Sequence, residues 1–192
     1  RGRLYRAIFD LRRVLEPETP GSKSSYVVLQ GGVVRLTEAV VADADEFEAR
    51  VEAGRQHERV GATSLAAREY LAAVRLYRGD FLADDLYEDW LYPRRNRLRD
   101  LYIATLSRLA ELSAQQGRWL EAVEHLRKAL ESEPTLEELH VQLITALAKA
   151  GRRSAALEQY DTCRKILQQE LDVEPAKETR QLRERLLARV PL

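Results

Sequence analysis

Histidine, cysteine and clustered carboxylates supply most catalytic and metal sites, and this chain keeps them apart. Its three histidines, His57, His125 and His140, lack the HxxxH or HExxH spacing that places two imidazoles on one helix face. Cys163 is the only cysteine, so there is no metal-type group of Cys and His residues. The position of Cys163 on a helix face where a small residue is needed favours a packing role.

One acidic segment is the remaining candidate for a cation site. It contains Asp84, Asp85, Glu88 and Asp89, but it lacks the ligand spacing, the Gly and the final Glu of an EF-hand loop. A solvated loop explains it better. The chain also has no GxSxG sequence and no glycine loop that could hold a phosphate. The sequence therefore predicts no catalytic residues, no metal ligands and no cofactor, and it does not predict an enzyme.

Composition sets further bounds. The 192 residues carry 31 Lys and Arg against 31 Asp and Glu, which disfavours a general polyanion-binding surface but allows a local one. No apolar run is long enough to span a membrane, no signal sequence opens the chain, and a single cysteine suits a reducing cytoplasm. The absence of methionine suggests a fragment of a longer chain, or a chain that has lost its start Met.

The elements that would position any site are helices, and the clearest of them repeat. The sequence LAELSAQQGRWLEAVEHLRKALESEP is echoed by LITALAKAGRRSAALEQYDTCRKILQQELDVEP. Gly117 and Gly151 are 34 residues apart, and so are Ala122 and Ala156. This is the period of tetratricopeptide repeats, in which a turn joins two antiparallel helices. Small residues such as Ala122 let the two helices approach closely.

Further helices flank these repeats. Residues 44–58 and 64–77 indicate a degenerate first repeat, with Ala67 and Leu71 near the small and bulky positions of its second helix. An irregular, aromatic segment over 81–92 is expected to fold back and pack through its aromatic rings. Pro93 suits the first position of a long helix over 94–116. A final helix over 177–189, apolar on one face and charged on the other, is the type of cap that repeat arrays need.

The N-terminal end is different. Residues 4–15 predict an amphipathic helix with a basic outer face, and two β-rich runs at 26–29 and 33–36 flank a Gly pair, which predicts a hairpin. A basic helix followed by a hairpin is the second half of a winged-helix domain. Residues 1–40 carry seven Lys and Arg against four Asp and Glu, a net charge of +3.

This basic end is the candidate DNA-binding site, because arginines on a recognition helix meet phosphates and base edges in the major groove, and a wing adds backbone contacts. An ordinary solvated face is the alternative. The candidate DNA-binding residues are Arg3, Arg6, Arg12, Arg13, Lys23 and Arg35.

A second candidate site is the groove that stacked helix pairs form on their concave side, which commonly holds a peptide or a partner helix. The residues expected to line or rim it are Arg94, Arg95, Arg118 and Arg152. The alternative for each of them is an ordinary polar residue in a turn or on a helix surface.

The order of motifs carries a family resemblance. The helix LRRVLEP, the hairpin SYVVLQGGVVRL, then DADEFE, LYRGDFL, the W-x4-R-x2-L pattern at Trp90, Arg95 and Leu98, two GR-centred repeats and LDVEP together resemble the antibiotic-regulatory, SARP-type transcriptional activators. Residues 40–189 resemble their bacterial transcriptional activator domain, and residues 1–37 resemble the last third of their OmpR-type winged helix.

The resemblance implies a mainly α fold: a TPR-like α-α superhelix over 39–192, preceded over 1–38 by the helix and β-hairpin that end a winged helix. It implies a cytoplasmic, DNA-binding regulator whose partners are promoter DNA, a second copy of the chain and RNA polymerase. Asp10 and Gln30 depart from the family pattern, which often has a basic or neutral polar residue at the first position and commonly an Arg at the second, at the tip of the wing. The alternative function is a protein-interaction scaffold that does not bind DNA itself.

Overall fold

The computed structural model describes residues 2–17, 24–83 and 89–190. The chain divides into two compact units, Arg1–Asp45 and Glu46–Leu192, which are described separately. The predicted boundary between residues 38 and 39 stays a prediction.

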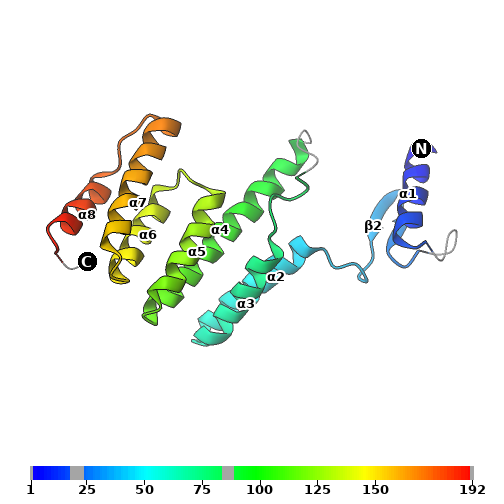
Figure 1. The fold of residues 1–192 in the computed structure, drawn as a ribbon. Coiled ribbons are helices and arrows are strands. Elements are labelled where there is room, and N and C mark those ends of the chain that lie inside the picture. Colours follow the sequence, from blue (N-terminus) through cyan, green and yellow to red (C-terminus); the bar gives the residue numbers. More distant parts are fainter. Residues whose placement is uncertain (1, 18–23, 84–88, 191–192) are drawn as a thin grey trace. The chain divides into compact units, whose positions relative to one another are not determined.

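The first unit contains a helix and a hairpin (Figure 1). The helix α1 spans Gly2–Leu15, and the antiparallel strands β1 (Val27–Gln30) and β2 (Val33–Leu36) follow it. Gly31 and Gly32, between the strands, have positive φ angles of 59° and 80°. Glycine adopts such angles without strain, and a two-residue turn of this kind matches the twist of the paired strands. The predicted helix and hairpin are confirmed.

The second unit is a row of helices, which follow one another in chain order in Figure 1. Together with α2, which begins at the end of the first unit, its helical elements are α2 (Asp43–Arg59), α3 (Thr63–Leu76), η1 (Asp89–Leu91), α4 (Tyr92–Gln115), α5 (Trp119–Ser132), α6 (Glu137–Lys149), α7 (Arg153–Ile166), η2 (Leu167–Leu171) and α8 (Lys177–Leu187). The mainly α, TPR-like fold predicted from the sequence is confirmed.

Three helix pairs turn in the same way. Gly61, Gly117 and Gly151 have φ angles of 73°, 72° and 76°. The N–H of the residue after each glycine donates to the carbonyl five residues back, at 2.8, 2.9 and 2.8 Å. A positive φ with this long-range bond is the Schellman ending, which satisfies the last carbonyls of a helix. The shared geometry shows that α2 and α3 are a first repeat, as predicted.

The small residues that set the helix spacing stand in one register. The residue five places after each turn glycine is almost inaccessible in all three pairs: Ala66, Ala122 and Ala156. Seven places further on, three more small side chains have no exposed surface: Ala73, Ala129 and Cys163. In the first repeat the small position is Ala66, the immediate neighbour of the Ala67 that the sequence places near it. The packing role predicted for Cys163 is confirmed, and its burial raises the pKa of the thiol to about 12.

One close contact in the first pair had not been expected. Gly54 of α2 lies under the ring of Tyr70 on α3, and a Cβ added at Gly54 would clash with Cε1 of that ring. Tyr70 also donates its hydroxyl hydrogen to Glu58 at 2.7 Å. Arg108 of α4 donates to the same carboxylate at 2.7 Å. This carboxylate therefore fastens the first repeat to the second.

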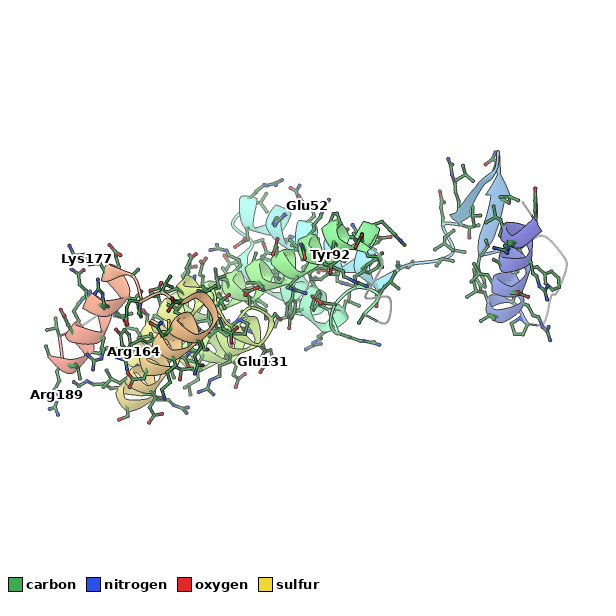
Figure 2. The ribbon with its side chains drawn as sticks, turned by 90° about the horizontal axis from the view of Figure 1, so that it is seen from above. Glu52, Tyr92, Glu131, Arg164, Lys177 and Arg189 are labelled. Carbon is green, nitrogen blue, oxygen red and sulfur yellow. The ribbon has the colours of Figure 1, made fainter. Side chains whose placement is uncertain are left out.

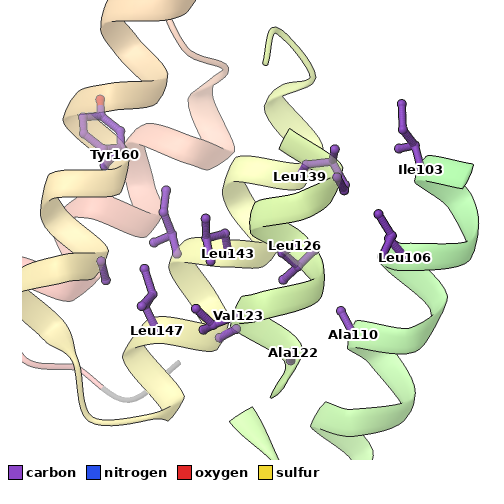
Figure 3. Packing of buried hydrophobic residues seen from close by; sticks show 14 of the residues in the cluster. Ile103, Leu106, Ala110, Ala122, Val123, Leu126, Leu139, Leu143, Leu147 and Tyr160 are labelled. Atoms are coloured by element: carbon purple, nitrogen blue, oxygen red, sulfur yellow. The ribbon is translucent and has the colours of Figure 1, made fainter. Parts of the chain in front are cut away.

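The main core lies among α4, α5, α6 and α7, where apolar side chains from four helices interdigitate (Figure 3). Leu106 and Ala110 of α4 face Ala122 and Leu126 of α5, and α6 adds Leu143. The closeness of these helices follows from the small residues between them.

The insertion between the first and second repeats is held by a clamp. Arg95 of α4 is 5% exposed, and its Nε donates to the carbonyl of Phe81 at 2.7 Å, while its Nη2 donates to that of Leu82. Arg99, one turn later, pairs with Asp80 at 2.5 Å. Hydrogen bonds from Arg99 lower the pKa of Asp80. The motifs RGDFL and W-x4-R-x2-L are therefore two halves of one contact.

The prediction that this insertion packs through its aromatic rings is wrong for two of them. Trp90 and Tyr92 are 71% and 52% exposed, and fully buried Leu91 is the anchor between them. Tyr87 and the acidic residues Asp84, Asp85 and Glu88 lie outside the described residues. Tyr77, just before RGDFL, instead stacks on Tyr102 with 4.2 Å between ring centroids.

The last repeat ends differently from the one before it. A π-helical turn, η2, prolongs α7 by five residues, and Asp172 then reverses the chain with a φ of 55°. Next, α8 closes the array; Figure 2 labels Lys177, its first residue, and Arg189, two residues after its last. Glu137 of α6 accepts from the N–H of Ala176 at 2.8 Å. These contacts fit the predicted terminal cap.

Arg153 of α7 completes the cap. Its Nε and Nη2 donate to the carbonyls of Leu186 and Leu187 at 2.6 and 2.7 Å, so a cation meets the C-terminal end of α8, where the helix dipole favours it. Among the described residues, no helix is long and apolar enough to cross a membrane.

His140 is a buried, fully hydrogen-bonded histidine. Its side chain is 2% exposed on α6. Nε2 lies 2.9 Å from the carbonyl of Pro134, to which it must donate, and Nδ1 lies 2.7 Å from the amide nitrogen of Gln159, from which it accepts. Both ring nitrogens are satisfied only in the neutral form. Burial lowers the pKa of His140.

We expect Ala122→Leu and Ala156→Leu each to lower the free energy of unfolding by about 1–3 kcal/mol, because a larger side chain overfills the helix contact. Ala155→Leu, at a half-buried position on the same helix as Ala156, is the control and should cost less. Chemical denaturation measures all three. Unchanged stability in both test variants would contradict the packing register.

Replacing Arg95 by Ala should destabilise the chain by about 2–4 kcal/mol, because the carbonyls of Phe81 and Leu82 lose a charged donor and a buried side chain is removed. Arg97→Ala removes a 71% exposed side chain from the same helix and should cost less than about 1 kcal/mol. Thermal unfolding of the two variants provides the comparison. Equal losses of stability in the two variants would show that the hydrogen bonds of Arg95 do not hold the insertion.

The pH dependence of stability should reveal His140. A lowered pKa in the folded state means that stability is complete above the ordinary histidine pKa of about 6.5 and falls as pH drops below it. Burial also lowers the pKa of His125, so the measurement is made in a His125→Gln background. There, His140→Gln should flatten the decline in unfolding free energy between about pH 7 and pH 5. An unchanged slope would refute the neutral assignment.

Candidate nucleic-acid interface and repeat groove

The first unit exposes a row of arginines. Arg3, Arg6 and Arg13 are exposed on α1, and their spacing places them on one side of the helix. Asp10 is exposed in the same row, four residues after Arg6 and three before Arg13. A carboxylate in this position weakens the attraction of the row for phosphate. Arg35 is exposed on β2, and Lys23 lies outside the described residues.

Arg12 has a different role from its neighbours. It is half-buried, and its Nη2 donates to the carbonyl of Val27 on β1 at 2.9 Å. Glu16, one turn later, accepts from the N–H of Ser25 at 2.7 Å and from the hydroxyl of Ser24. The hydrogen bond from Ser24 is the main reason that the pKa of Glu16 is lowered. Arg12 and Glu16 therefore fix the hairpin against α1.

The apolar side of α1 is only partly covered. Leu4, Leu11 and Leu15 are 46%, 41% and 42% exposed, and Ile8 and Val27 are the buried apolar residues that hold helix to hairpin. A helix and one hairpin bury little apolar surface, because so small a unit has few buried side chains. The polar contacts of Arg12 and Glu16 consequently matter more here than such bonds do in a large core.

The second unit carries a groove along the first helices of its repeats. Three adjoining hollows make up this groove. One, between α2 and α4, has a volume of about 790 Å³. The next, between α4 and α6, has about 500 Å³ and shares Asp100 and Ala104 with the first. The third, of about 240 Å³, shares Gln142 with the second and reaches Trp119 of α5.

The groove is acidic in the middle. Asp100, Glu133 and Glu138 line the central hollow, and neither Lys nor Arg does. Asp100 and Glu138 are exposed and form no ion pair with any residue that the structure describes. In the first hollow, by contrast, Glu48 pairs with Arg94 at 2.8 Å and with Arg97 at 3.1 Å.

None of the four arginines predicted for the groove lines the three hollows. Arg95 is buried in the clamp described above, which makes its assignment wrong. Arg94 neutralises Glu48 from beside the first hollow. Arg118 pairs with Glu121 at 2.5 Å in its own turn, and Arg152 is exposed at the equivalent turn. The Gly-Arg turns lie at helix ends, whereas most residues that line the three hollows belong to α2, α4 and α6.

The groups with potential for catalysis remain separate. His57, His125 and His140 belong to α2, α5 and α6. In the part of the chain that the structure describes, no three His, Cys, Asp or Glu side chains are grouped so as to hold a metal ion.

Known proteins resemble this chain both in sequence and in fold. The regulatory protein DnrI of Streptomyces peucetius is 29% identical over 161 residues, which are 84% of this chain and 59% of DnrI. A structure of Mycobacterium tuberculosis EmbR in complex with a low-affinity phosphopeptide matches all of this chain and 50% of that one, with a TM-score of 0.74 and 26% identity. The chain thus spans little more than half of these relatives.

A TPR-containing domain of a Plasmodium falciparum putative FK506-binding protein matches 80% of the chain with a TM-score of 0.54 and 15% identity, which shows the shared helical-repeat fold alone. The family model of the bacterial transcriptional activator domain matches residues 42–187. That range covers the three repeats, the clamped insertion and the terminal helix, and the chain belongs to the bacterial transcriptional activator domain family.

Proposed function

We propose that the chain is part of a cytoplasmic transcriptional activator, in which the first unit contacts promoter DNA and the repeat unit makes protein contacts. The observation that carries the proposal is the exposed arginine row of α1, placed beside a hairpin in a chain whose relatives are named as regulatory proteins. Contacts with a second copy and with RNA polymerase belong to the same proposal and rest on the family resemblance.

The arginines take different roles in it. Arg3, Arg6 and Arg13 reach the DNA from one side of α1, and Arg35 adds a phosphate contact from the hairpin. Such charged contacts release counterions, so the affinity falls as salt rises. Arg12 positions the hairpin through its bond to Val27. Lys23 remains a proposed phosphate contact.

The proposal predicts a salt-dependent complex between the full-length natural protein and a DNA fragment from upstream of its own gene. Binding is measured by gel shift from about 50 mM to about 200 mM salt. Arg6→Ala and Arg13→Ala should each weaken binding and reduce the slope of log affinity against log salt by about 1, because each removes one phosphate contact.

Arg127→Ala is the matched control, because Arg127 is an exposed arginine on α5, far along the chain from α1. Its affinity and its salt slope should equal those of the wild type. Failure to shift upstream DNA at every salt concentration would contradict DNA binding and would favour the scaffold function.

A further inference from the structure

The groove of the repeat unit has the opposite charge to the helix α1. In its central hollow, three carboxylates stand together without a lining cation. Glu133 is engaged locally by the hydroxyl of Thr135 at 2.7 Å, whereas Asp100 and Glu138 are exposed and make no ion pair within the described residues. Two facing helices, α4 and α6, therefore present carboxylates to one hollow.

The same hollow has an apolar side. Ile103 and Leu139 form its floor, at 8% and 2% exposure, and Leu136 projects at its rim, 40% exposed. Arginine and lysine side chains combine an apolar stem with a charged head. A hollow with an apolar floor and carboxylates around it suits both parts of such a side chain.

The adjoining third hollow is smaller and mostly apolar. Ala110, Ala114, Val141 and Trp119 line it, and its one acidic residue, Glu111, already pairs with Arg108. From Asp100 to Ala114 the helix α4 rises by roughly 21 Å. An extended peptide of about six residues covers that length. The groove thus offers an acidic site and an apolar site within the reach of one short segment.

We propose that this groove binds a short basic segment of a partner protein, with Arg or Lys side chains between Asp100 and Glu138 and an apolar side chain in the hollow beside Trp119. Charge complementarity selects this occupant, since an acidic peptide or a nucleic acid phosphate would meet three carboxylates. The inference rests on the proposal that the repeat unit makes protein contacts, and it names the chemistry of the partner.

The test uses the 192-residue chain and three fluorescein-labelled peptides of twelve residues. This length is about twice the six extended residues that reach from Asp100 to Ala114. All share the same alanines and leucines and carry Arg, Gln or Glu at the polar positions. Fluorescence anisotropy should show saturable binding of the Arg peptide and at least about tenfold weaker binding of the other two. Binding of the Arg peptide should weaken as salt rises.

Charge-neutral variants locate the contact. The double change Asp100→Asn with Glu138→Gln should lower the affinity for the Arg peptide by about tenfold, because two charge-assisted contacts are lost. The control is Glu124→Gln with Glu158→Gln, which removes two exposed carboxylates on α5 and α7. This control should keep the wild-type affinity to within about twofold.

Three results would overturn the inference: no binding of the Arg peptide, equal binding of all three peptides, or equal losses in the groove and control variants. Self-association of the chain that disappears in the groove variant would also overturn it, by identifying a second copy as the occupant. DNA binding by the same variants is measured in parallel. Unchanged DNA binding together with any of these results would overturn the groove proposal and leave the DNA-binding proposal intact.

Discussion

The close approach of paired helices at residues with almost no side chain is the constraint on which the second unit depends. Ala66, Ala122 and Ala156 stand five residues after a turn glycine and are essentially inaccessible. The positive φ of the glycine sets where the second helix starts, and the alanine then sets how near it comes to the first. Everything that faces the groove or the core takes its position from this arrangement.

The periodic part of the sequence could be predicted well because its signals are local. A turn glycine and a small residue at a fixed distance follow from backbone sterics, and they locate the helix pairs of the two clear repeats. The hairpin and the final cap follow from equally local patterns, a Gly pair between two β-rich runs and a helix that is apolar on one face and charged on the other. The small position of the first repeat can be placed only to within one residue. The 34-residue spacing fixes the register of the other two repeats, and the first repeat has no glycine at that spacing. Neighbouring alanines at 66 and 67 left its phase undecided.

A charged side chain is hard to place from the sequence when its partners lie far away along the chain. Arg95 finds its acceptors in backbone carbonyls fourteen and thirteen residues earlier, which no side-chain pattern reveals. The insertion is expected to pack through its aromatic rings, but Leu91 occupies the buried position and Trp90 is exposed. The acidic groove is not evident from the sequence because its carboxylates come from α4, α6 and the segment between α5 and α6, which the fold brings to one hollow.

The end of the array restricts how the domain can evolve. Because η2 displaces the chain after α7 and because Arg153 and Glu137 hold the two ends of α8, the surface against which another helix pair would stack is already occupied. Tandem duplication at this end would have to discard α8 first. Lengthening is easier inside the array, between units that share the same turn, so the domain has a fixed terminus and an extensible interior.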